Sequence, residues 1–241
     1  DYKGALEALS AAERAGEKED GLYLIRGKSY YQQKEYTAAI PDHEKGVQKG
    51  TADLAAYEAI SLSYLAVQKE KQALIALEKA ASMDSKSKDV YYQMGNLRIK
   101  ENNLAGAIEA YDKAITLGAN DEVIFNNRGK AKLNGGKLQE SIGDFDRALG
   151  LKKDYTQALK NRASARYQLK EYPGVIADLA IVVSRGEAGA EEFASLGISK
   201  YRTKDYQGAI TDLTKAIDTG SKDNFTHAAR GLSFYALKES E

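Results

Sequence analysis

The sequence contains no cysteine, and this absence removes several kinds of chemistry. Without cysteine among its 241 residues, the chain has no disulfide, no thiolate metal site and no cysteine nucleophile. Proline is also scarce, with 2 residues against 21 glycines and 16 tyrosines, a balance that suits a mostly helical chain. No apolar run approaches the roughly 18 residues that a membrane span requires.

The sequence has no excess of charge of either sign. Its 35 Lys and Arg face 35 Asp and Glu, so its net charge provides no long-range attraction to nucleic acid or anionic lipid. No signal-peptide pattern opens the sequence, and its first residue is Asp1 and not Met, so we expect a piece of a longer protein. Metal-ligand spacings and nucleophile–base sets are also missing, so we predict no metal site, no cofactor, no catalytic residue and no enzyme.

A period of 34 residues runs through the sequence. With Asp20 as position 1, position 8 is small in every repeat: Gly27, Ser61, Gly95, Gly129, Ala163, Gly197 and Gly231. Glycine within a helix costs about 1 kcal/mol relative to alanine, so this series indicates the close approach of a neighbouring helix. We expect that helix to present the small residue at position 20. Gly95 should then lie against Ala107, and likewise Gly129 against Ser141.

The remaining periodic positions follow two helical faces. Positions 4, 8 and 11 share one face, and positions 20, 24 and 27 share another, with a short polar turn such as residues 33–35 between them. Both histidines, His43 and His227, fall on these packing positions. Position 31 supplies glycines that can end a helix in the left-handed conformation: Gly16, Gly50, Gly118, Gly186 and Gly220. Each repeat is therefore predicted to be a hairpin of helix A followed by helix B.

This combination of small residues at positions 8, 20 and 27 with large residues at 4, 17 and 24 resembles the tetratricopeptide repeat, over essentially the whole chain. The resemblance implies an all-α fold, a right-handed solenoid of antiparallel helix hairpins. Arg-Gly at positions 7 and 8 with Asp at 23 is similar to bacterial members. The chain departs from the family at position 32, where the usual proline is missing, and at position 11, where cations often replace tyrosine: Arg98, Lys132, Arg166 and Lys200.

The repeats set the expected organisation, which is a single solenoid domain. Residues 1–19 should form helix B of a preceding repeat, and residues 224–241 helix A of a seventh. Between them we expect repeats 1 to 6, which cover residues 20–53, 54–87, 88–121, 122–155, 156–189 and 190–223.

Two positions of the repeat vary together. Arg at position 7 is always accompanied by Asp at position 23, whereas Ile or Met at position 7 is accompanied by Ala. A buried arginine needs an acceptor, so we expect a salt bridge across each such hairpin: Arg26–Asp42, Arg128–Asp144 and Arg162–Asp178. Leu196 with Asp212 breaks the rule, and chance agreement among six repeats is the alternative.

In the tetratricopeptide repeat family, helix A lines a concave groove. The resemblance places a set of amides, lysines and tyrosines there, and we predict that it binds a partner: Tyr92, Asn96, Asn126, Asn127, Lys130, Lys160, Asn161 and Tyr167. Asparagine can pair with the backbone of an extended peptide whatever its side chains, and lysine attracts carboxylates. The alternative interpretation is a solvated polar face.

Repeat 2 differs, because its groove positions are apolar and include Ala55, Ala59, Leu62 and Leu65. Such a stretch could dock a helix or be covered by other parts of a longer protein. The clamp that some family members use on a C-terminal carboxylate is incomplete, since Tyr92 stands where a basic residue belongs.

These observations favour a scaffold or adaptor that binds a protein or extended peptide segment in its concave groove. An alternative is a regulatory or assembly arm of a larger bacterial envelope or secretion component. Nucleic-acid binding is disfavoured by the zero net charge and by the lack of a regular base-reading pair in each repeat. The compartment stays open, and the absence of cysteine leans slightly towards the cell envelope over the cytoplasm.

Overall fold

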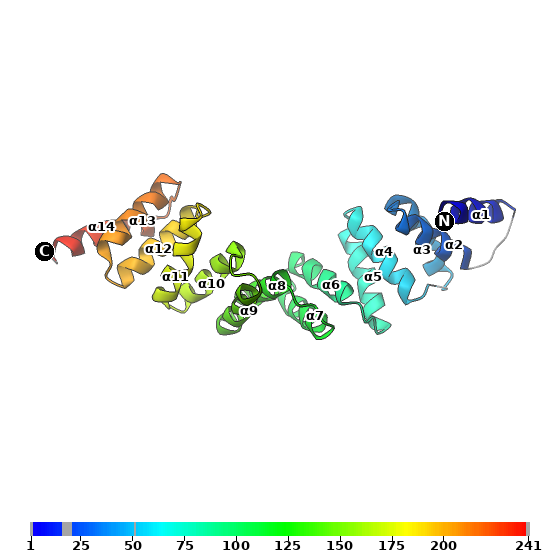
Figure 1. Cartoon of the computed structure of the whole chain (residues 1–241), viewed down its shortest axis with the longest axis horizontal. Helices are drawn as coiled ribbons and strands as arrows, with labels where there is room; N and C mark the ends of the chain where they lie inside the picture. Colours follow the sequence, from blue (N-terminus) through cyan, green and yellow to red (C-terminus); the bar gives the residue numbers. More distant parts are fainter. Residues whose placement is uncertain (1, 16–20, 51, 240–241) are drawn as a thin grey trace. The chain divides into compact units, whose positions relative to one another are not determined.

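The computed structural model of the chain describes residues 2–15, 21–50 and 52–239. Within these ranges the protein is all-helical and contains no strand, and its helices pair into hairpins (Figure 1). The predicted all-α solenoid of helix hairpins is therefore confirmed. Gly16 and Asp20, which belong to the predicted repeat pattern, lie outside the described residues. Among the residues described, no helix is both long and apolar enough to cross a membrane.

The chain divides into two compact units, Asp1–Ala119 and Asn120–Glu241. Unit 1 contains α1 (Tyr2–Arg14), α2 (Gly21–Gln32), α3 (Tyr36–Gln48), α4 (Leu54–Ala66), α5 (Glu70–Ser82), α6 (Lys88–Lys100) and α7 (Leu104–Thr116). Unit 2 contains α8 (Glu122–Asn134), α9 (Leu138–Leu151), α10 (Thr156–Gln168), α11 (Tyr172–Ser184), α12 (Ala190–Arg202), α13 (Tyr206–Asp218) and α14 (Asn224–Lys238). From α4 onward every even-numbered helix is a helix A, and the odd-numbered helix after it is its helix B.

The core of each hairpin lies between helix A and the inner face of helix B. Position 20 is fully buried in all six hairpins, as are the large residues at position 24, among them Leu77, Tyr111 and Phe145. His43 at this position is 1% exposed, as predicted. His227 is exposed, against prediction, since no helix B covers α14 within the described residues.

The glycines at position 8 do allow close helix packing, but their partners differ from those expected. A Cβ added to Gly95 would lie 2.5 Å from the ring of Tyr111, and one added to Gly129 would lie 2.7 Å from the ring of Phe145. The large residue at position 24, and not the small one at position 20, therefore occupies the space that glycine leaves. The atoms nearest to an added Cβ thus belong to position 24, and in repeat 4 also to Asp144, whereas Ala107 and Ser141 are not among them. A large residue facing each glycine fills the space that two small residues would leave empty.

The turn between helices A and B has a conformation that the sequence analysis did not foresee. Position 15 has a positive φ, between 57° and 75°, in all six hairpins: Lys34, Gln68, Asn102, Gly136, Lys170 and Lys204. Residues other than glycine rarely adopt this left-handed conformation, so the hairpin geometry imposes it. At position 31 the predicted stop signals are confirmed at four glycines with φ from 71° to 105°: Gly50, Gly118, Gly186 and Gly220.

Candidate protein-binding site

The three predicted salt bridges are present, and each joins helix A to helix B of its own hairpin. Arg26 Nε donates to Asp42 Oδ2 at 2.7 Å, and Arg26 Nη2 donates to Oδ1 at 2.6 Å. Arg128 and Asp144 pair in the same two-pronged way, with Nε to Oδ2 at 2.9 Å. The covariation of positions 7 and 23 therefore reflects a buried ion pair and not chance.

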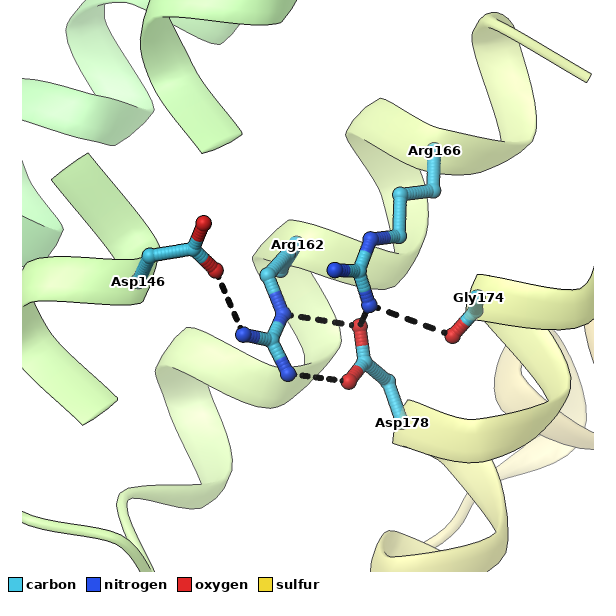
Figure 2. Close-up of polar contacts among 5 residues, drawn as sticks. All are labelled: Asp146, Arg162, Arg166, Gly174 and Asp178. Atoms are coloured by element: carbon cyan, nitrogen blue, oxygen red, sulfur yellow. Dashed lines mark hydrogen bonds and ion pairs between the residues drawn. The ribbon is translucent and has the colours of Figure 1, made fainter. Parts of the chain in front are cut away.

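The third pair belongs to a larger network in unit 2 (Figure 2). Arg162 Nε donates to Asp178 Oδ2 at 3.0 Å, and its Nη1 reaches Asp146 on the preceding helix B at 2.6 Å. Burial of the guanidinium opposes its charge, but the hydrogen bonds with Asp178 and Asp146 outweigh burial and raise the pKa of Arg162. Arg162 thus links two consecutive hairpins as well as the two helices of its own.

Cations at position 11 complete the network, and their role was missed. Arg166 Nη1 lies 2.8 Å from Asp178, and Lys132 Nζ lies 2.9 Å from Asp144. In repeat 6, where position 7 is leucine, Lys200 Nζ lies 2.7 Å from Asp212, which explains the one exception to the covariation. The contact with Asp212 is an ion pair without hydrogen-bond geometry. Three of the four cations that looked like departures from the family pattern therefore supply charge for position 23, and the fourth, Arg98, pairs with Glu78 instead.

The predicted asparagines of α8 and α10 bond to one another. Asn161 Nδ2 donates to Asn126 Oδ1 at 2.9 Å, and Gln157 Nε2 donates to Asn161 Oδ1 at 3.2 Å. Asn126 is 3% exposed, so the expectation that its side chain faces an open groove was wrong. Its amide Nδ2 also lies 3.5 Å from Oδ1 of the half-buried Asn127. This amide chain holds α8 to α10, with Gln157 and Asn127 at its two ends.

A pocket of about 280 Å³ lies entirely within unit 2. It is lined from α10 and α12, with Leu179 of α11 at its base, by Lys160, Ser164, Tyr167, Gln168, Glu191, Glu192 and Ser195. The ring of Tyr167 packs against the core cluster of repeat 6 and lies 6.2 Å from the ring of Tyr172, and burial raises the pKa of its hydroxyl. Tyr167 therefore forms a rigid wall of the pocket.

The two predicted lysines have different surroundings. Lys160 Nζ lies 3.2 Å from Glu192 across α10 and α12, so its charge is already compensated at the pocket. Lys130 on α8 is exposed and makes no ion pair with any described residue. We expected both to attract an acidic segment, and only Lys130 has its charge available for this.

The other predicted residues, Tyr92 and Asn96, lie on α6 and so belong to unit 1. Asn96 Oδ1 accepts a hydrogen bond from the Tyr111 hydroxyl at 2.8 Å, and the ring of Tyr92 lies 6.1 Å from that of Tyr111. Burial is the main cause that raises the pKa of Tyr111. The apolar stretch of repeat 2 contributes Ala55 and Ala59 to a separate pocket of about 210 Å³, also in unit 1.

Comparison with known proteins agrees with this architecture. Two tetratricopeptide repeat models match the chain, one over residues 88–121 and one over residues 1–55. Among solved structures, YrrB, described as a tetratricopeptide repeat protein with an unusual peptide-binding site, superposes with a TM-score of 0.66 at 20% identity, covering 81% of this chain and 97% of its own. No curated protein matches the sequence.

Two further solved structures share the fold. The C-terminal part of a tetratricopeptide repeat-containing protein from Cytophaga hutchinsonii superposes with a TM-score of 0.65 at 18% identity, covering 95% of this chain and 94% of that one. MamA from Desulfovibrio magneticus gives 0.62 at 18% identity, covering 71% and 97%. The chain thus contains tetratricopeptide repeats, a fold that serves as a scaffold for protein–protein interaction.

Proposed function

We propose that the protein binds an extended segment of another protein on the helix-A face of unit 2, with the pocket between α10 and α12 as its centre. The observation that carries the proposal is this pocket, because it gathers two of the predicted binding residues, Lys160 and Tyr167, with further polar side chains. The solved structure of YrrB, whose description names a peptide-binding site, supports the same use of the fold.

The lining of the pocket suits a peptide backbone flanked by small or polar side chains. Gln168, Ser164 and Ser195 offer both hydrogen-bond donors and acceptors, so they can pair with peptide N–H and C=O groups. Each such bond contributes about 0.5–1.5 kcal/mol net, and several together correspond to micromolar binding, about 8 kcal/mol. Because Glu191 adds a negative charge that Lys160 does not offset, an acidic side chain is disfavoured in the pocket itself.

Exposed Lys130, at the α8 end of the same face, favours an acidic side chain of the partner. A segment whose acidic residue lies towards α8 and whose neutral residues enter the pocket would satisfy both ends. This charge order is the specificity that the proposal predicts, and it replaces the uniform preference for acidic segments expected from the sequence.

The proposal can be tested with a matched pair of substitutions. Ser164 is exposed in the pocket, so Ser164→Arg should block it without disturbing the core. Ala180 is exposed on α11, and Ala180→Arg adds the same side chain elsewhere in unit 2. Peptides selected from a random phage-displayed library on the wild type should lose at least about tenfold in affinity for Ser164→Arg and keep their affinity for Ala180→Arg.

The measurement is fluorescence polarisation of the selected peptides, with circular dichroism melting as the control for folding. A library that yields no binder, or binders that tolerate Ser164→Arg, would overturn the proposed site. Binding that Ala180→Arg weakens instead would move the site to the helix-B face.

A further inference from the structure

The buried arginine at position 7 sits in a site with recurring components. In repeat 1 the guanidinium of Arg26 lies 5.8 Å from the ring centre of Tyr23 at position 4, and it bonds to Asp42 and to Glu13 on the preceding helix B. In repeat 4 the guanidinium of Arg128 lies 5.6 Å from the ring of Phe125 at the same position. In repeat 1 an aromatic ring, a carboxylate on the preceding helix B and the acid at position 23 hold the cation together. Repeat 4 shares the ring and the acid at position 23, and repeat 5, whose position 4 is Leu159, shares the two acids.

Repeat 2 keeps two of these components and lacks the arginine. Its position 4 is Tyr57, and the preceding helix B carries Glu44 at position 25, the position of Asp146 in the contact with Arg162. Position 7, however, is Ile60, and position 23 is the small Ala76. Because position 7 is isoleucine and not arginine, the ring of Tyr57 and the carboxylate of Glu44 lack the cation that the ring and the carboxylate of repeat 1 contact.

The space of the missing guanidinium is a pocket of about 280 Å³ within unit 1. Its lining includes one carboxylate, two aromatic rings and three aliphatic side chains, from Glu44, Val47, Tyr57, Ile60, Tyr64 and Ile75. Among the described residues no lysine or arginine lines it, and Glu44 is the only charged group. Glu44 Oε1 accepts a hydrogen bond from the Tyr64 hydroxyl at 2.6 Å, which orients the carboxylate. Ile75 is 68% exposed at the rim.

Repeat 3 also lacks the arginine, and its contrast with repeat 2 is informative. Met94 and Ala110 replace the pair and leave a pocket of about 610 Å³, but the chain's own cations enter it. Arg98 lies 3.2 Å from Glu78, the counterpart of Glu44, and Lys113 lies 5.9 Å from the ring of Tyr91. Among the described residues, repeat 2 therefore combines the ring of Tyr57 and the carboxylate of Glu44 with no lysine or arginine in the pocket lining, and Lys69 lies 6.0 Å from the second ring, that of Tyr64.

We propose that the repeat 2 pocket binds an arginine side chain of a partner protein, on the face opposite the helix-A groove. The guanidinium would stack on Tyr57 and pair with Glu44, and its aliphatic stem would contact Ile60 and Ile75. A planar guanidinium suits a ring beside a carboxylate better than an ammonium does, since it can stack and form hydrogen bonds at once. The charge complementarity rests on Glu44, the single charge of the described lining, whose other members are apolar residues, Tyr57, Tyr64, Gln48 and Gln72.

The probe for this proposal is Nα-acetyl-arginine methylamide, compared with its citrulline counterpart, which has the same shape and no charge. Two-dimensional amide NMR spectra of the whole chain should show saturable shifts around Glu44, Tyr57 and Ile75 with the arginine compound. A single side chain should bind with a dissociation constant on the order of 1 mM, and the citrulline compound at least about tenfold more weakly. Equal shifts with both compounds, or no saturable shift, would overturn the proposal.

Variants make the assignment specific. Glu44→Gln should weaken binding of the arginine compound at least about tenfold, and Glu78→Gln, which removes the same charge at the next pocket, should leave it unchanged. The double variant Ile60→Arg with Ala76→Asp copies the pair of repeats 1, 4 and 5, so it should fold and fill the pocket with an internal arginine. Retained binding in Glu44→Gln or in the filled variant would show that the probe binds elsewhere.

Discussion

The buried ion pairs allow a prediction that compares two hairpins of one chain. Arg26 is 8% exposed and Asp42 is 4% exposed, and no other cation of the described residues reaches Asp42. Substitution Arg26→Met therefore leaves a buried carboxylate without its partner, which costs about 3–5 kcal/mol of unfolding free energy. In repeat 5, Arg162→Met leaves Asp178 with Arg166 at 2.8 Å, so we expect a smaller loss, about 1–3 kcal/mol.

A double-mutant cycle tests the physical reason. Adding Asp42→Ala to Arg26→Met should recover most of the loss, because repeat 3 already carries the same pair of residues as Met94 and Ala110. Because proteins open locally as well as globally, local stability is best followed by amide hydrogen exchange in α2 and α10, with urea unfolding of the whole chain beside it. Equal losses for Arg26→Met and Arg162→Met, or a double variant no more stable than Arg26→Met, would refute the reasoning.

Three further predictions follow from packing and backbone geometry. Burial lowers the pKa of His43 to about 4, so the unfolded chain binds a proton more readily than the folded chain does. Up to about 3 kcal/mol of unfolding free energy should therefore be lost as pH falls from 6.5 to 4. Urea unfolding across this pH range should show the loss in the wild type and not in His43→Leu. Lys204→Gly should raise the free energy of unfolding by about 1 kcal/mol, and Gly136→Lys should lower it by about 1 kcal/mol, because both positions have positive φ; equal effects of the two substitutions in calorimetry would contradict this. Gly129→Leu should cost at least about 1–3 kcal/mol in urea unfolding because Phe145 occupies the space.

The helix hairpins and the salt bridges could be predicted because they repeat. Six repeats in one chain act as their own comparison, so the period and the pairing of positions 7 and 23 are visible without a structure. The role of position 11 was not visible, because Lys200 and Arg166 reach acids twelve residues further on, across a turn whose geometry the sequence does not specify.

The candidate site was predicted only in part. Helix periodicity assigns Asn126 to the groove face, but the next helix A packs against α8 and encloses its side chain. The ion pair between Lys160 and Glu192 was also not predicted, because the sequence alone does not show that α10 and α12 bring the two residues together. Which side chains stay available to a partner depends on how consecutive hairpins stack. Differences of a few ångströms in this stacking decide whether a side chain is exposed or paired, and the spacing of residues along the chain does not reveal them.

The central claim, that unit 2 binds a protein segment through the pocket of α10 and α12, is tested most directly by site-specific photo-crosslinking. Benzoylphenylalanine would replace Gln168, an exposed residue of the pocket, or Ala180 on α11 as the matched position, and a selected peptide would be added before irradiation. We predict a crosslinked product from the Gln168 variant and none from the Ala180 variant. Crosslinking from Ala180 alone, or from neither position at peptide concentrations that saturate binding, would contradict the account.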